Sequence, residues 1–114
     1  MKQRIYVDGS GDGRHCWINE TTNAKKVYRK SGITNNEAEY LAVYNAILEN
    51  KSGDMEILSD SKLAVNQLNG NWHIKEDRLR NLFDKIQEII KQKNIKVAFI
   101  WVPREENKAG KCLG

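Results

Sequence analysis

Arg4-Ile5-Tyr6-Val7-Asp8-Gly9-Ser10-Gly11 is the stretch of this chain that decides its fold. An apolar run stops at an acid and then at glycines, a pattern typical of a strand that delivers one side chain to an exposed tip. The glycines allow another backbone or a ligand to come close. In the alternative interpretation, Asp8 only caps the turn of a surface hairpin. Two later acids favour the first interpretation.

Length and composition bound the possible architectures. With 114 residues the chain has room for one modest core, and we expect residues 1–114 to form a single domain. No apolar run approaches the roughly 20 residues that span a membrane, and the first residues lead into a strand rather than a signal-peptide core. We therefore expect a cytoplasmic protein with no membrane partner.

The two cysteines and the net charge identify neither a metal site nor a binding partner. Cys16 and Cys112 lie far apart, have no Cys-x-x-Cys partner and find only two histidines as co-ligands, which disfavours a zinc site and favours two free thiols in a reducing compartment. A net charge of +4 and a pI near 9.1 tilt the molecule toward polyanions. Many proteins that never bind nucleic acid share that balance.

The first half of the chain predicts a meander followed by a helix. Residues 15–19 and 25–30 have the composition of short strands separated by a turn, so they extend the first strand into an antiparallel meander. Thr34 and Glu37 match a capping box, which starts a helix with Glu39 in its first turn. The helix face that we expect against the sheet carries Ala38, Leu41, Ala42, Ala46 and Leu48, and the pattern ends at the break 50–53.

The second half repeats the opening pattern. Residues 56–59 form a short apolar run that ends at Asp60, and Ser61 then precedes a helical stretch over 62–68. The short connection favours a crossover that lays this strand parallel to the first, so Asp60 should emerge at the same sheet edge as Asp8. Three-and-four spacing of apolar residues predicts a further helix from residue 79 to 90. A last strand over 96–102 ends at Pro103, and residues 105–114 begin a terminal helix.

This order of elements predicts an α/β fold with one mixed sheet flanked by helices. Asp8, Glu39 and Asp60 should converge at one edge of that sheet. Carboxylates this close repel one another unless a cation offsets their charge, and a hard divalent ion such as Mg²⁺ is the natural occupant. Two such ions about 3.5 to 4 Å apart would form a clamp for displacement at phosphorus.

Four segments together resemble type 1 ribonuclease H, in particular its short variants without a basic protrusion. The segments are Tyr-Val-Asp-Gly-Ser at 6–10, Thr-Asn-Asn-Glu-Ala-Glu-Tyr at 34–40, Leu-Ser-Asp-Ser at 58–61 and Trp-Val-Pro-Arg-Glu-Glu-Asn at 101–107. They span essentially the whole chain in the order of the family. The resemblance implies a ribonuclease H-like fold with a five-stranded mixed sheet, made of an antiparallel meander plus parallel strands.

The resemblance also implies an activity and roles for the acids. The expected enzyme is a metal-dependent endonuclease that hydrolyses the RNA strand of RNA–DNA hybrids with two Mg²⁺ or Mn²⁺ ions, acting as a monomer. By position, Asp8 bridges both ions, while Glu39 and Asp60 hold the ion on the leaving-group side. The family's frequent loop histidine has no match here, and we expect His15 and His73 to be ordinary surface or packing residues.

The fourth acid of the family is missing. It normally lies four residues after the position of Asn107, and here that spacing leads to Lys111, with Leu113 in register; a shift by one gives Gly110, which is no carboxylate either. The resemblance therefore implies weakened catalysis, because the missing ligand belongs to the ion that activates water. The Lys111 ammonium either replaces part of a metal's charge or pairs with Asp8 and closes the site. Nearby, Glu105 and Glu106 are substitutes to consider, although solvated loop acids are the favoured interpretation.

Substrate contacts follow from the same resemblance. Asn35 and Asn36 are assigned to the minor groove of the hybrid, where amides can address 2′-hydroxyls, and capping is their structural alternative. Ser10 and Gly11 offer backbone contacts to the RNA strand. Trp72 either stacks on a sugar of the DNA strand or covers the core.

Two other functions remain open at this point. Lys111 favours a catalytically silent module that binds RNA–DNA hybrids or duplex RNA by shape. A junction resolvase of the same fold is a broader option, and the Thr-Asn-Asn-Glu-Ala-Glu segment argues against it.

Overall fold

A computed structural model of the chain describes residues 2–51 and 53–113. Its five strands are β1 (Gln3–Gly9), β2 (Arg14–Asn19), β3 (Lys25–Arg29), β4 (Met55–Ser59) and β5 (Val97–Trp101). Its helical elements are α1 (Asn35–Glu49), α2 (Lys62–Leu68), α3 (Asp77–Lys93), the 3₁₀ turn η1 (Arg104–Glu106) and α4 (Gly110–Leu113). Among the described residues, no helix combines the length and the apolar character needed to cross a membrane.

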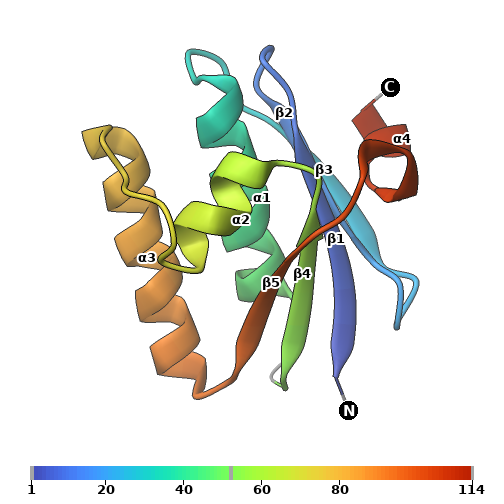
Figure 1. Cartoon of the computed structure of the whole chain (residues 1–114). Coiled ribbons are helices and arrows are strands. Elements are labelled where there is room, and N and C mark those ends of the chain that lie inside the picture. Colours follow the sequence, from blue (N-terminus) through green and yellow to red (C-terminus); the bar gives the residue numbers. More distant parts are fainter. Residues whose placement is uncertain (1, 52, 114) are drawn as a thin grey trace.

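The strands form one mixed sheet in the order β3-β2-β1-β4-β5. Neighbouring strands β1, β2 and β3 are antiparallel, whereas β4 runs parallel to both β1 and β5. Helices α1, α2 and α3 lie on one side of this sheet and α4 lies on the other (Figure 1). The predicted fold class, an antiparallel meander joined to parallel strands and flanked by helices, is confirmed.

Strand alternation divides the apolar residues between the two faces of the sheet. Ile5 and Val7 of β1 belong to the main core, which fills the space between the sheet and helices α1 and α3. Tyr6 points to the opposite face, where a smaller cluster packs beneath α4. Because Asp8 is two residues beyond Tyr6, its side chain leaves β1 on the same side as α4.

Helix α1 begins as the sequence predicts. The Thr34 hydroxyl accepts a hydrogen bond from the Glu37 backbone N–H at 3.1 Å, and the Glu37 carboxylate accepts one from the Thr34 N–H at 3.1 Å. The helix ends at Glu49, just before the predicted break, of which Ser52 lies outside the described residues.

For one residue of α1, Leu48, the predicted burial is wrong. Leu48 is 42% exposed, while Ala38, Ala42 and Ala46 are buried as predicted. The helix advances by about 100° per residue, so Leu48 points away from the row of alanines and Ile47 occupies the buried position instead. Leu41 lies between these extremes and is only partly buried.

The C-terminal segment is also less regular than predicted. Instead of one helix over 105–114, the chain forms η1, breaks at Asn107 and then makes the short helix α4, and Gly114 lies outside the described residues. The Asn107 side chain causes the break, because it turns inward and donates a hydrogen bond to the Val7 carbonyl at 2.9 Å. Its own oxygen accepts from the Ala109 N–H at 3.0 Å.

Candidate active site

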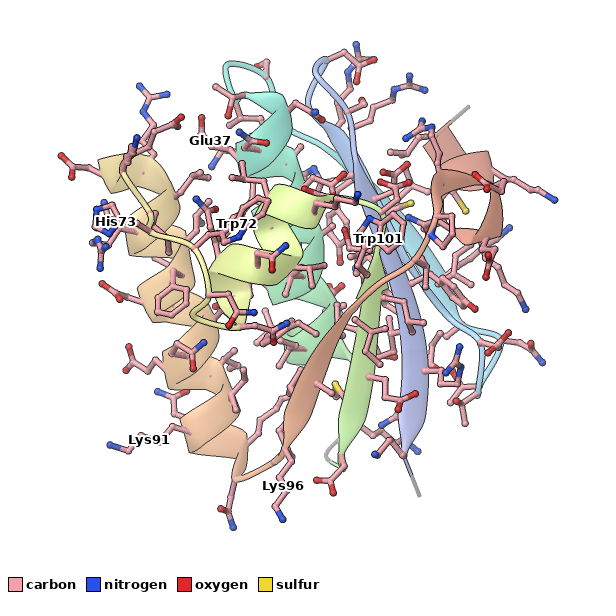
Figure 2. All side chains as sticks on the ribbon, in the orientation of Figure 1. Glu37, Trp72, His73, Lys91, Lys96 and Trp101 are labelled. Atoms are coloured by element: carbon pink, nitrogen blue, oxygen red, sulfur yellow. The ribbon has the colours of Figure 1, made fainter. Side chains whose placement is uncertain are left out.

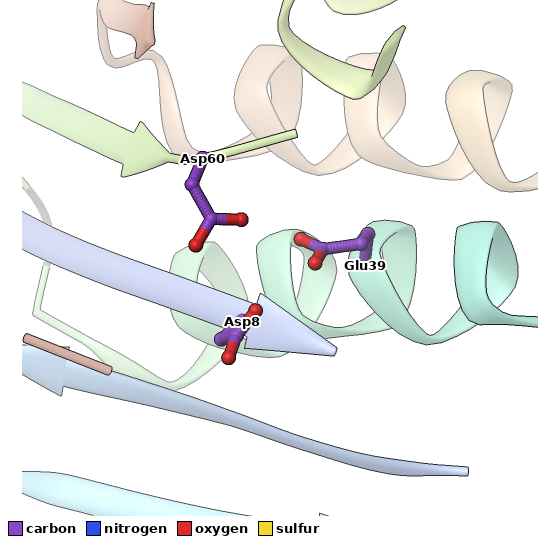
Figure 3. A group of neighbouring side chains, drawn as sticks. All are labelled: Asp8, Glu39 and Asp60. Atoms are coloured by element: carbon purple, nitrogen blue, oxygen red, sulfur yellow. The ribbon is translucent and has the colours of Figure 1, made fainter. Parts of the chain in front are cut away.

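Parallel pairing of β1 and β4 brings two acids to one sheet edge. Tyr6 lies opposite Leu58 in the parallel register, so Asp8 and Asp60, each two residues further on, leave the sheet at the same end. Glu39 of α1 joins them (Figure 3); it is the fifth residue of the helix and so lies just beyond the first turn, in which the sequence had placed it. One carboxylate oxygen from each of the three acids lies within 4.8 Å of the others. The structure thus brings together all three acids that the sequence singles out.

Gly9 explains how α1 comes so close to the end of β1. A Cβ atom at this position would lie 2.5 Å from both the Ala38 carbonyl carbon and the Glu39 nitrogen, closer than real Cβ contacts allow. Only glycine therefore fits without moving the helix. The Gly9 backbone N–H also donates a hydrogen bond to Glu39 Oε1 at 3.1 Å, which fixes the carboxylate over the strand end.

Ser59 supports Glu39 from the neighbouring strand. Its hydroxyl lies 3.4 Å from Glu39 Oε2 as a donor, and it accepts a hydrogen bond from the Ser61 backbone N–H at 3.0 Å. Glu39 is thereby tied to the ends of both β1 and β4. These contacts orient its carboxylate toward Asp8 and Asp60.

Asp60 is held by two residues to which the sequence assigned no role. Asn107 Nδ2 lies 3.3 Å from Asp60 Oδ2, and Arg104 Nη1 lies 3.4 Å from the same oxygen. Asn107 is buried, whereas the Arg104 side chain is 75% exposed and free to move toward a ligand. The sequence could have predicted these contacts, because Arg104 and Asn107 follow the last strand, which ends at the same sheet edge as Asp60.

The electrostatics of the acids favour a bound cation. Burial first, and then the charge of Asp8, raises the pKa of Glu39 to about 9. Burial is also the main reason why the pKa of Asp8 is raised, with the charge of Asp60 acting in the same direction. Asp8 Oδ1 is buried and finds no hydrogen-bond partner within residues 2–51 and 53–113. Hard oxygen ligands, mutual repulsion and an unpartnered carboxylate oxygen all fit a divalent cation.

A cleft of about 440 Å³ opens next to the acids. Its walls include Ser10, Gly11 and Asn35, three of the predicted substrate-binding residues, together with Glu39 and Asp60. Gly9, Ser61 and Arg104 complete the lining. The cleft therefore joins the acids to the loop after β1 and to the N-terminus of α1.

Two predicted substrate residues lie outside the lining of this cleft. Asn36 is the second residue of α1 and is partly exposed. Trp72 lies in the connection between α2 and α3, and its side chain is 48% exposed (Figure 2). Trp72 is thus about half open to solvent, an exposure that fits both alternatives considered from the sequence.

Lys111 is exposed and lies in a different hollow. It shares a cavity of about 370 Å³ with Tyr6, Glu105, Glu106 and Lys108, next to Asn107. Within the described part of the chain, no hydrogen bond or ion pair joins Lys111 to Asp8, so the closed arrangement considered from the sequence is not observed. In α4, Gly110 lies next to Asp8, because a Cβ added there would be 3.8 Å from Asp8 Oδ2.

The remaining ionisable residues named from the sequence play no part in the cluster. His15 is buried and stacks on Tyr28 with ring centroids 5.4 Å apart. His73 is exposed beside Trp72 (Figure 2). Glu105 and Glu106 are exposed residues of η1. Both histidines are thus the surface or packing residues that the sequence predicts.

Comparison with known proteins identifies the family. The family described as reverse transcriptase-like matches residues 8–114. The bifunctional protein Rv2228c of Mycobacterium tuberculosis is 34% identical over 120 residues, which cover 94% of this chain and 33% of that protein. The uncharacterized protein YpeP of Bacillus subtilis is 31% identical over 80 residues, which cover 66% of this chain and 35% of that protein. The chain thus spans about a third of the length of these curated relatives.

Solved structures share the fold over nearly the whole chain. Ribonuclease H1 from the archaeon Halobacterium salinarum superposes with a TM-score of 0.86 at 24% identity, covering 99% of this chain and 94% of that one. The N-terminal ribonuclease H domain of Rv2228c gives a TM-score of 0.82 at 26% identity, with coverages of 99% and 95%. LC11-RNase H1, solved in complex with an RNA/DNA hybrid, gives 0.81 at 25% identity, with coverages of 98% and 99%. The match over residues 8–114, supported by these superpositions, shows that the chain belongs to the reverse transcriptase-like family, with the fold of the type 1 ribonucleases H.

Proposed function

We propose that this chain is a single ribonuclease H-like domain that hydrolyses the RNA strand of RNA–DNA hybrids in a reaction that depends on divalent metal ions. The observation that carries the proposal is the convergence of Asp8, Glu39 and Asp60 within 4.8 Å, with one oxygen of Asp8 buried and unpartnered in the described chain. The family match and the hybrid-bound relative LC11-RNase H1 support the choice of substrate.

Asp8, Glu39 and Asp60 would hold Mg²⁺ or Mn²⁺, with two ions expected. Such ions, when bound, lower the pKa of an attacking water and stabilise the leaving oxygen. Glu39 must lose a proton before it can act as a ligand, because burial raises its pKa to about 9. The hydrogen bonds from Gly9 and Ser59 orient the Glu39 carboxylate, so it needs little rearrangement on binding.

The cleft supplies contacts to the nucleic acid. The exposed Asn35 amide, at the start of α1, can donate to 2′-hydroxyls and base edges in the minor groove without reading a sequence. Ser10 and Gly11 offer backbone groups to the RNA strand on the other wall of the cleft. The Arg104 guanidinium, at the rim, has the geometry that binds phosphate oxygens. We assign Asn36 and the half-exposed Trp72 to the flanks of the same hybrid.

A second candidate function is hybrid binding without chemistry. The observation that favours it is that the acid group found among the described residues has three carboxylates, while the family position of the fourth carries Lys111 and Gly110 lies next to Asp8. In that case the acids and the cleft would still recognise the hybrid, and the cleavage rate would be negligible.

Cleavage of an end-labelled RNA–DNA hybrid in Mg²⁺ and in Mn²⁺ tests the proposal. We expect the RNA strand to be cut, and Asp8→Asn to reduce the rate at least about a hundredfold because it removes a ligand and a charge. Asp84→Asn, an exposed acid of α3 outside the cluster, is the control and should cleave like the parent. If no cleavage occurs in either metal while hybrid binding persists, the protein is the silent module.

A further inference from the structure

The fold brings the two cysteines together beneath α4. Cys16 of β2 is fully buried on the sheet face that α4 covers, in an apolar cluster that also includes Tyr6 and Ala109. The Cys112 side chain, from α4 itself, is partly buried and packs against the same cluster. Both are free thiols in the structure, as the sequence predicts.

A shared hydrogen-bond acceptor limits how far apart the two residues can be. The Cys16 thiol donates to the Ala109 carbonyl oxygen at 3.3 Å, and the Cys112 backbone N–H donates to the same oxygen at 3.1 Å. Cys16 Sγ therefore lies no more than roughly 6.4 Å, the sum of those distances, from the Cys112 nitrogen. The Cys16 sulfur thus lies close to the backbone of Cys112, in the same cluster into which the Cys112 side chain packs.

The electrostatics of Cys16 reflect the neighbouring Cys112 thiol. Burial first, and the neighbouring Cys112 thiol second, raise the pKa of Cys16 to about 12. Cys16 is therefore protonated near neutral pH and is the slower of the two thiols to react. Cys112 is the more exposed member of the pair and the one that a small reagent can reach.

We propose that Cys16 and Cys112 form a reversible disulfide that ties α4 to β2 beside Asp8. The co-reactant is a small-molecule disulfide such as oxidised glutathione. Cys112, as the thiolate, attacks one sulfur of that disulfide, forms a mixed disulfide and releases one thiolate, which takes up a proton. Cys16 then loses its proton and attacks the Cys112 sulfur, releasing the second small thiol. Two protein thiols are oxidised and one small disulfide is reduced to two thiols.

The bridge would act on the two elements that flank Asp8. Cys16 is the residue paired with Asp8 across the β1–β2 ladder, and Gly110 of α4 lies against Asp8 Oδ2. Helix α4 has only four residues, so its position depends on packing rather than on its own hydrogen bonds. A covalent tie between β2 and α4 would hold the C-terminal segment against the sheet and remove unfolded-state freedom over most of the chain.

Mass spectrometry and thermal melting of the full chain test the proposal. After incubation with oxidised glutathione, we expect a mass loss of about 2 Da and a Cys16–Cys112 cross-linked peptide. We also expect a rise in Tm of at least about 5 °C that dithiothreitol reverses. These readouts report on the thiols alone, so they do not depend on whether the chain cleaves hybrids.

Two single variants test which of the two thiols reacts first with oxidised glutathione. Cys16→Ser should stop at a glutathione adduct on Cys112, and Cys112→Ser should remain unmodified because Cys16 is fully buried. Cys112→Ser replaces a partly exposed residue and is the informative variant if Cys16→Ser does not fold. A stable glutathione adduct in the parent protein, cross-links only between molecules, or an oxidised monomer with an unchanged Tm would each overturn the proposal.

Discussion

Glu39 and Asp8 are buried acids that oppose each other's ionisation. The hydrogen bonds from Gly9 and Ser59 do not offset the loss of water around Glu39, whose pKa is raised. Each added negative charge at this sheet edge therefore costs folding free energy in the metal-free protein. A bound cation would reverse that cost, which couples metal binding, protonation and stability.

This coupling predicts a pH dependence with a definite sign. The folded-state pKa of Glu39 lies above its ordinary value of 4.5, at about 9. Its contribution to the free energy of unfolding is therefore complete below about pH 4.5 and is lost as the pH rises through about 9. We expect urea unfolding in EDTA to show falling stability between these values.

Mn²⁺ affinity should change in the opposite direction over the same range, because the ion must displace the Glu39 proton. Calorimetric titration should show tighter binding at pH 8 than at pH 6 and proton release to the buffer. Glu39→Gln should remove most of the pH dependence of both stability and binding. A pH-independent affinity in the parent protein would contradict the role of Glu39 as a protonated ligand.

Gly9 supplies the second prediction at the residue scale. Gly9→Ala places a Cβ 2.5 Å from backbone atoms of Ala38 and Glu39, so α1 must move away from β1. We expect a loss of about 2 to 4 kcal/mol in the free energy of unfolding, measured by urea denaturation. Gly11→Ala is the matched control, because an added Cβ there meets no atom within 4 Å. Equal stability of the two variants would refute the close-packing argument.

At the scale of elements, α4 decides whether the acid cluster is complete. Lys111→Asp places a carboxylate at the family position of the fourth acid, on an exposed face of α4. Residue 111 lies in the hollow beside Asn107, so its carboxylate joins the acids only if α4 turns toward them when metal binds. One more ligand to the water-activating ion would then stabilise the transition state by a few kcal/mol at most. We expect hybrid cleavage to rise at least about tenfold, most clearly at low metal concentration.

Two companion variants distinguish the effect of adding a metal ligand from the effect of removing the positive charge of Lys111. Lys111→Gln removes the positive charge without adding a ligand, and we expect a much smaller gain in rate. Gly110→Asp adds a carboxylate where a Cβ would lie in ordinary van der Waals contact with Asp8 Oδ2, at 3.8 Å, and shows whether position 110 can supply the ligand instead. Equal rates for Lys111→Asp and Lys111→Gln would show that no ligand is missing at residue 111.

At the scale of the whole molecule, the cleft and the modest positive charge predict a preference among nucleic acids. With Asp8→Asn to prevent cleavage, fluorescence anisotropy should show tighter binding to an RNA–DNA hybrid than to duplex DNA of the same sequence. Affinity should fall as salt rises, because phosphate contacts release counterions. Asn35→Ala should weaken hybrid binding about fivefold and leave DNA binding nearly unchanged.

The control for that experiment is Asn81→Ala, an exposed asparagine of α3 outside the cleft. It should bind both duplexes like the parent protein. Equal affinity for hybrid and DNA at one salt concentration would count against recognition of 2′-hydroxyls by this cleft.

Local sequence determined much of this protein. The capping box at Thr34, the strand ends at Asp8 and Asp60, and the amphipathic α3 are signals written in neighbouring residues, because backbone hydrogen bonding and side-chain periodicity act over a few positions. The parallel pairing of β1 and β4 followed from a short crossover connection. Together they predicted the fold and the convergence of the three acids.

Tertiary structure alone decided which distant groups touch. Asn107 holds Asp60 from across the chain, Gly110 rather than a charged residue lies against Asp8, and Cys16 meets Cys112 beneath α4. It also turned Leu48 outward, because the rotation of α1 depends on its packing against the sheet. Such contacts join segments that no local pattern links. Their distances depend on strand register and on how closely elements pack, and these are set only when the whole core forms.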